Sequence, residues 1–127
     1  MNNNNKYVFI VDSSMTSANR IFSALGEMAF ILKVDHATNG KDALKKIKSN
    51  PPNAILFDLQ LPGEEGVEIM KQIKEKHPNI ILIVLTDYPT AYSHKICKKL
   101  GANGFYNKTS ELEMALKQLG GYYKKVA

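Results

Sequence analysis

Short apolar runs alternate along this chain with segments in which apolar residues recur every three or four positions. Most of the runs are continuously apolar over four to six residues, which is typical of strands buried on both faces of a parallel sheet. The recurring positions between the runs are typical of helices that bury one face. The pattern therefore predicts five repetitions of strand then helix, with strands at residues 7–11, 31–34, 54–57, 80–85 and 104–106.

Prolines and glycines stand where the second to fifth predicted helices should end. They are Pro51 and Pro52, Pro78 after His77, Gly101, and the pair Gly120 and Gly121. Parallel strands need crossover helices, and right-handed crossovers on both sides of one sheet give a doubly wound α/β fold. We therefore predict a five-stranded parallel sheet in the strand order 2-1-3-4-5, with helices on both faces.

The length of 127 residues corresponds to one domain, because domains usually span roughly 100 to 200 residues. A polar run of asparagines, Asn2 to Asn5, precedes the first predicted strand, and little sequence follows the last predicted helix. We therefore predict a disordered leader at residues 1–5, a folded domain at residues 6–121 and a short C-terminal tail at residues 122–127.

Composition excludes several classes of protein. The longest apolar run, residues 80–85, is far shorter than the roughly 20 residues that a membrane helix needs. The single cysteine, Cys97, excludes a disulfide framework and a cysteine-based zinc site, and its place among apolar residues predicts burial. The net charge of +5 is spread over both halves, and no aromatic residues interleave its lysine pairs. We therefore expect a cytoplasmic protein without a nucleic-acid site.

Polar residues follow four of the predicted strands closely. They are Asp12 after the first strand, Asp58 after the third, Thr86 after the fourth and Lys108 after the fifth. In doubly wound sheets the ligand site lies beyond the carboxyl ends of the strands, so these side chains should converge on one crevice. Neighbouring carboxylates repel each other unless they share a proton or bind a hard cation such as Mg²⁺, and a lysine can neutralise one of them.

Either aspartate alone could simply cap the helix that follows it. The convergence of two carboxylates, a hydroxyl and an ammonium instead favours a site that stabilises a transferring phosphoryl group, with an aspartate as the nucleophile.

Four ordered motifs carry a resemblance to a known family. They are FIVDSS at residues 9–14, ILFDLQLPG at residues 55–63, VLT at residues 84–86 and GANGFYNK at residues 101–108. In this order and spacing the chain resembles, from residue 6 to about residue 119, the receiver domain of two-component response regulators, especially the single-domain, CheY-like members. The resemblance implies the flavodoxin-like form of the predicted fold.

The resemblance also implies a role for each site residue. Asp58 would accept a phosphoryl group from a sensor histidine kinase or a phosphotransfer protein. Asp12, Asp58 and the backbone carbonyl of Gln60 would hold Mg²⁺. Thr86 would hydrogen-bond a phosphoryl oxygen, and Lys108 would pair with it. The protein would then be a signalling module that assists its own phosphorylation and dephosphorylation, and not otherwise an enzyme.

A switch is implied as well. Phe105 would turn inward as Thr86 moves to the phosphoryl group, and the face built from the fourth helix, fifth strand and fifth helix would then bind a downstream protein.

Three residues depart from the family pattern. Where the family usually has the second of two consecutive acids after the first strand, this chain has Ser13, a neutral and poorer Mg²⁺ ligand. Asp87 stands where a small residue is common, and its charge would oppose a phosphoryl group if it points inward. Thr109 stands where many members have proline. We therefore expect weaker Mg²⁺ binding than in a receiver that has the acid pair.

Two alternatives remain open at this point. A pseudo-receiver would keep the fold and act as a phosphorylation-independent interaction module, because Ser13 weakens the acidic pocket. A flavodoxin-like electron carrier would bind FMN through the hydroxyls of residues 13–17 at a helix N-terminus. Against the second alternative, that loop contains no glycine, and Asp12 would repel the phosphate.

Overall fold

The computed structural model describes residues 5–123, so most of the predicted leader (residues 1–4) and tail (residues 124–127) lies outside the described residues. The strands are β1 (Lys6–Val11), β2 (Ile31–Ala37), β3 (Ala54–Phe57), β4 (Ile81–Thr86) and β5 (Gly104–Asn107). The helices are α1 (Met15–Leu25), α2 (Gly40–Ser49), α3 (Gly66–Lys76), α4 (Ala91–Lys99) and α5 (Leu112–Tyr123). Strand and helix therefore alternate five times, as the apolar pattern predicts.

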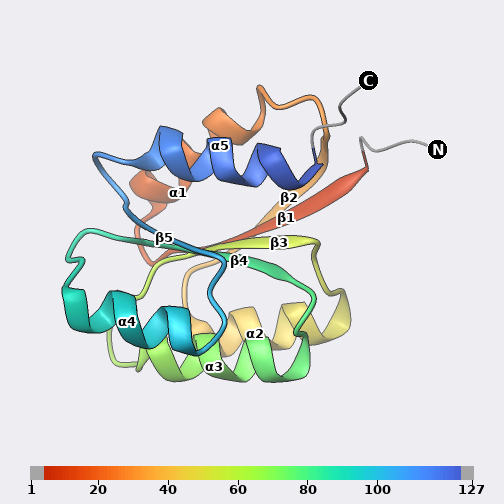
Figure 1. Cartoon of the computed structure of the whole chain (residues 1–127). Helices are drawn as coiled ribbons and strands as arrows, with labels where there is room; N and C mark the ends of the chain where they lie inside the picture. Colours follow the sequence, from red (N-terminus) through yellow and green to blue (C-terminus); the bar gives the residue numbers. More distant parts are fainter. Residues whose placement is uncertain (1–4, 124–127) are drawn as a thin grey trace.

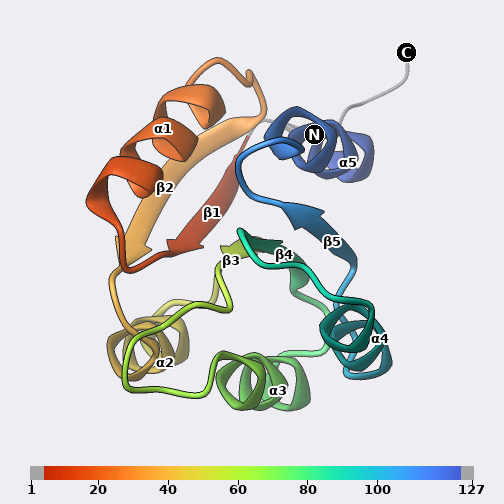
Figure 2. The same ribbon diagram turned by 90° about the vertical axis from the view of Figure 1, so that its left-hand side faces the viewer.

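All neighbouring strands are parallel, and their order in the sheet is β2-β1-β3-β4-β5. Helices α1 and α5 cover one face of the sheet, and α2, α3 and α4 cover the other (Figures 1 and 2). The predicted doubly wound fold is thus confirmed. Because the strands are parallel, their carboxyl ends all lie at one edge of the sheet.

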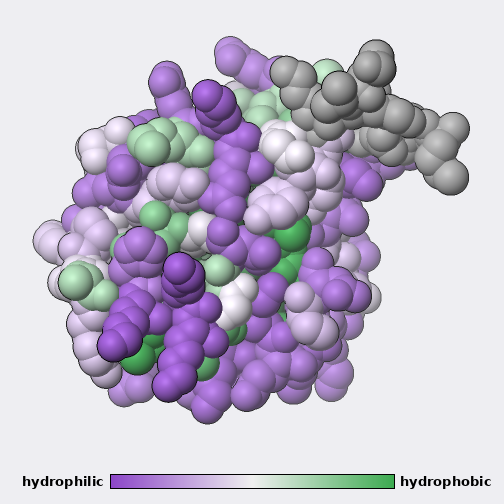
Figure 3. Space-filling view, in the orientation of Figure 1, coloured by the Kyte–Doolittle hydropathy of each residue, from purple (hydrophilic) through white to green (hydrophobic). Residues whose placement is uncertain are grey.

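Two apolar clusters, one on each face of the sheet, form the core. Successive strand side chains point to opposite faces, so Val8 and Ile10 pack with α1 and α5, whereas Phe9 and Val11 pack with α2 and α3. Each such buried side chain contributes about 1.5–3 kcal/mol of hydrophobic stabilisation. Hydrophilic residues cover most of the surface seen in Figure 3. Within residues 5–123 no helix is long and apolar enough to cross a membrane.

β2 is longer than the apolar run that predicts it. The run ends at Val34, but Asp35, His36 and Ala37 continue the ladder and pair with Phe9, Ile10 and Val11 of β1. β2 lies at the edge of the sheet, where polar side chains reach solvent while the backbone stays paired. Tertiary pairing with β1 therefore extends β2 beyond its apolar residues.

The prediction that Gly120 and Gly121 end the last helix is wrong, because α5 continues through both glycines to Tyr123. Neither glycine has a positive φ, and the last turn is held by contacts outside the helix. The Tyr123 ring lies 5.7 Å from the Phe30 ring, centroid to centroid, and its hydroxyl donates to the carbonyl of Asn53 over 3.0 Å. Tyr122 and Tyr123 thus belong to α5 and not to a separate tail.

Candidate functional site

The four polar residues predicted from the strand ends meet at the carboxyl edge of the sheet. Asp12, Asp58, Thr86 and Lys108 are all buried, none more than 6% exposed. Backbone hydrogen bonds carry the ladder just past the strands and fix these positions. Asp58 N–H donates to Val11 over 2.9 Å, and Lys108 N–H donates to Thr86 over 3.0 Å.

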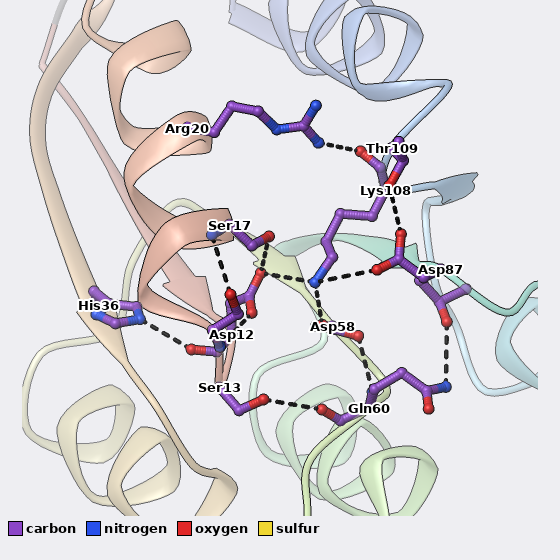
Figure 4. A network of polar contacts seen from close by, with 12 residues as sticks. Asp12, Ser13, Ser17, Arg20, His36, Asp58, Gln60, Asp87, Lys108 and Thr109 are labelled. Carbon is purple, nitrogen blue, oxygen red and sulfur yellow. Dashed lines mark hydrogen bonds and ion pairs between the residues drawn. The ribbon is translucent and has the colours of Figure 1, made fainter.

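The ammonium of Lys108 lies between the two carboxylates (Figure 4). Its Nζ is 2.7 Å from Oδ2 of Asp58 and 3.2 Å from Oδ2 of Asp12. The three groups carry a net charge of −1 when all are ionised, and the lysine compensates the repulsion between the carboxylates. Burying charged groups destabilises a fold unless each charge is paired. Here both carboxylates pair with the Lys108 ammonium.

Burial and pairing act on the Asp58 carboxyl in opposite directions. Burial raises its pKa, and the hydrogen bonds from Lys108 and from the Gln60 N–H offset only part of that effect. The pKa of Lys108 is raised, because its hydrogen bond and ion pair with Asp58, helped by Asp12, outweigh the lowering by burial. Burial therefore disfavours the ionised form of Asp58, whereas the neighbouring Lys108 stays protonated.

The first turn of α1 is built around Asp12. Oδ1 of Asp12 accepts from the Ser14 N–H over 2.8 Å, and Oδ2 accepts from the Ser17 hydroxyl over 2.6 Å. The Ser14 hydroxyl caps α1 by accepting from the Ser17 N–H. The Ser14 and Ser17 hydroxyls thus make hydrogen bonds within the protein, which counts against the FMN hypothesis.

Gln60, Thr86 and Ser13 are joined by hydrogen bonds beside the two aspartates. The Gln60 side-chain amide donates to Oγ1 of Thr86 over 3.3 Å, and Thr86 Oγ1 also accepts from the Tyr88 N–H over 3.2 Å. The Ser13 hydroxyl donates to the backbone carbonyl of Gln60 over 3.3 Å. Ser13 therefore lies beside the Gln60 carbonyl, which the family resemblance implies as a metal ligand.

The loop after β3, which carries Asp58 and Gln60, is anchored at two points. The Glu64 carboxylate accepts from the N–H groups of Gly40 and Lys41, over 2.7 and 3.0 Å, at the N-terminus of α2. At the start of α3, a Cβ added to Gly66 would lie 2.2 Å from the carbonyl oxygen of Leu59. The loop therefore packs too closely on α3 for any side chain at that position.

Phe105 lies outside this cluster. Its ring stacks on His94 of α4, with centroids 4.6 Å apart and planes at 4°, and it is partly buried against the core. The family resemblance implies that Phe105 is the switch residue, and the structure shows one position of the ring.

Sequence analysis assigned no role in the phosphoryl site to two residues that support it. Ser17 orients Asp12, and Arg20 donates from Nη2 to the Lys108 carbonyl over 2.6 Å (Figure 4). Both project from α1 toward the site. The available signal was their helical spacing after Asp12, since Ser17 and Arg20 are three residues apart and therefore share a face.

Known proteins are similar to this chain in sequence and in fold. The profile of the response regulator receiver domain matches residues 8–119. Sporulation initiation phosphotransferase F of Bacillus subtilis is 30% identical over 112 residues, which cover 86% of each protein. A protein-glutamate methylesterase/protein-glutamine glutaminase of Treponema denticola is 31% identical over 110 residues, and the chain spans 30% of that longer relative. The crystal structure of a CheY-like receiver domain protein from Methanospirillum hungatei JF-1 has a TM-score of 0.84 at 23% identity, covering 93% of both chains.

Proposed function

Because the chain belongs to the response regulator receiver domain family of two-component signalling, we propose that Asp58 accepts a phosphoryl group from a phosphohistidine. The observation that carries this proposal is the pairing of the buried Asp58 carboxylate with Lys108 over 2.7 Å, beside Asp12 and Thr86. A nucleophilic carboxylate and a fixed cation at one point provide what phosphoryl transfer requires.

In the transfer, a carboxylate oxygen of Asp58 attacks phosphorus, the new O–P bond forms and the P–N bond to the donor imidazole breaks. The leaving imidazole takes a proton from solvent. Lys108 stays protonated and pairs with the negative charge on the phosphoryl oxygens. Thr86 would lose the hydrogen bond that it accepts from the Gln60 side-chain amide. Its hydroxyl would then donate a hydrogen bond to a phosphoryl oxygen.

The donor set suits a hard cation. Two carboxylates, the Gln60 carbonyl and the Ser13 hydroxyl are all oxygen ligands, which Mg²⁺ prefers. We propose that Asp12, Asp58 and the Gln60 carbonyl hold Mg²⁺, which supplies positive charge to the phosphoryl oxygens. Ser13 contributes an oxygen without charge, so the ion would keep more of its water and bind weakly.

We further propose that the donor is a sensor histidine kinase or a phosphotransfer protein in the cytoplasm. Phosphorylation would move Thr86 and Phe105 and change the face formed by α4, β5 and α5, which would bind a downstream protein and not a nucleic acid.

Mass spectrometry of the intact protein tests the proposal. The chain is incubated with Mg²⁺ and acetyl phosphate, and we expect the gain of one phosphoryl group that hydroxylamine removes, because an aspartyl phosphate is a reactive mixed anhydride. Incubation with a chelator in place of Mg²⁺ is the control. A mass unchanged with acetyl phosphate and with a purified phosphohistidine donor would contradict phosphorylation.

That negative result would favour the second candidate, a pseudo-receiver that binds its partner without phosphorylation. All four carboxylate oxygens of Asp12 and Asp58 already accept hydrogen bonds within the protein, which is the observation in its favour.

Replacing Ser13 with aspartate should tighten Mg²⁺ binding by on the order of tenfold, because the new carboxylate adds both charge and a ligand beside the Gln60 carbonyl. Calorimetric titration of Mg²⁺ into both proteins measures the change. Ser23→Asp, which adds the same charge further along α1, should leave the affinity near that of the wild type. Superimposable titrations of wild type and Ser13→Asp would show that Ser13 does not face the metal.

A further inference from the structure

Two residues that depart from the family pattern contact each other. Thr109, in the segment after β5, donates its hydroxyl hydrogen to Oδ1 of Asp87, in the segment after β4, over 2.7 Å (Figure 4). A proline in place of Thr109 would have no side-chain donor. The two departures therefore form one interaction between neighbouring loops of the site.

This hydrogen bond holds the other Asp87 oxygen toward the phosphorylation site. Oδ2 of Asp87 lies 3.9 Å from Nζ of Lys108, the ammonium that pairs with Asp58. The Asp87 side chain is 41% exposed, and an exposed ion pair at such a distance contributes little by itself. The bond from Thr109 is therefore the main contact that keeps this carboxylate beside Lys108.

Other hydrogen bonds hold the backbone beside this contact. The Lys108 N–H donates to the Thr86 carbonyl over 3.0 Å, and Arg20 donates to the Lys108 carbonyl over 2.6 Å. The Tyr88 N–H donates to the Thr86 hydroxyl. These bonds hold the backbone at Thr86, Tyr88 and Lys108. Within residues 5–123 the Asp87 side chain has only its bond from Thr109 and its weak ion pair with Lys108, so loss of the Thr109 bond lets the side chain turn and loosens the segment that carries it.

We propose that Asp87 and Thr109 form a latch that opposes phosphorylation of Asp58, a role that rests on the proposed function. A phosphoryl group adds a charge of about −1.5 to −2 next to Lys108. A carboxylate held at Lys108 repels that charge and competes for the same ammonium. Opening of the Asp87–Thr109 bond turns the carboxylate to solvent and frees the segment between β4 and α4. Asp87 is thus a positioning residue that acts through Lys108.

Binding of beryllofluoride with Mg²⁺, a non-covalent mimic of the phosphoryl group, tests the latch. Thr109→Val removes the hydroxyl and keeps the shape, Thr109→Ser keeps the hydroxyl, and Asp87→Asn removes the charge. We expect Thr109→Val and Asp87→Asn each to bind the mimic about five- to tenfold more tightly, from the loss of one nearby like charge. Thr109→Ser should match the wild type. The double variant Asp87→Asn/Thr109→Val should bind no more tightly than either single variant.

Wild-type affinity in Thr109→Val would overturn the latch, and so would gains that multiply in the double variant. Hydrogen exchange without the mimic gives a second readout, in which the amides of Asp87, Tyr88 and Thr90 should exchange several-fold faster in Thr109→Val than in Thr109→Ser. Equal exchange in those two variants would overturn the latch whatever the binding result. If no protein bound the mimic while exchange differed as expected, the proposed function would fail, and the opposing role of the latch with it.

Discussion

Asp58→Asn should take up no phosphoryl group from acetyl phosphate under conditions that phosphorylate the wild type. The amide keeps the shape of the side chain and an oxygen to accept from the Gln60 N–H, but it is no longer a nucleophile. Intact mass before and after incubation gives the result. Asp42→Asn, which changes an exposed carboxylate paired with Lys46 on α2, should be phosphorylated like the wild type. A hydroxylamine-sensitive phosphoryl group on Asp58→Asn would place the acceptor on another residue.

The same substitution should stabilise the fold at neutral pH. Because the pKa of Asp58 in the folded protein lies above its ordinary value of 3.8, the folded state holds this proton more tightly than the unfolded chain. Wild-type stability therefore falls as pH rises from about the unfolded pKa through the folded one, and Asp58→Asn does not share that loss.

Urea unfolding of the wild type and of Asp58→Asn between pH 3 and pH 8 checks the direction of this pH dependence. We expect the gain in the free energy of unfolding from Asp58→Asn to grow as the pH rises and to level off above the folded pKa. A gain that shrinks toward neutral pH would mean that Lys108 stabilises the ionised carboxylate more than burial penalises it.

Gly66→Ala should destabilise the protein by about 3 kcal/mol, the upper end of the usual cost of overpacking. The new Cβ would lie 2.2 Å from the carbonyl oxygen of Leu59, and backbone cannot move aside as a flexible side chain does. Since Leu59 lies between Asp58 and Gln60, phosphoryl uptake should fall as well. Urea unfolding and intact mass measure the two effects.

Gly121→Ala is the matched control within another helix. A Cβ at Gly121 meets nothing within 4 Å, and its φ is not positive, so alanine should stabilise α5 by about 0.5–1 kcal/mol. Equal effects of the two substitutions would show that the close contact at Gly66 relaxes without cost.

Periodicity and strand ends predicted most of the fold and the centre of the site. Continuous apolar runs identify strands covered on both faces, and this burial implies parallel strands, crossover helices and one edge where the carboxyl ends meet. Asp12, Asp58, Thr86 and Lys108 could therefore be grouped from their positions after four strands, and the structure brings them together. Cys97 was expected in the core and is fully buried there.

The features that sequence analysis missed depend on contacts between distant segments. Gly120 and Gly121 are poor helix formers, but Tyr123 binds Phe30 and Asn53 and keeps the last turn of α5 helical. Asp87 and Thr109 were each recognised as departures, yet their hydrogen bond joins residues 22 positions apart. The pattern of neighbouring residues in the sequence does not indicate such pairs, because they come together only when the sheet forms.

The anchoring of the loop after β3 gives the site one stiff side and one compliant side. Glu64 fastens this loop to α2, and the close contact at Gly66 leaves it no room to move on α3. Across the site, side-chain hydrogen bonds to Thr86 and Asp87 restrain the segment before α4. We therefore expect strain introduced at Asp58 to be relieved on the side where the restraint is weaker, toward α4 and away from α2 and α3.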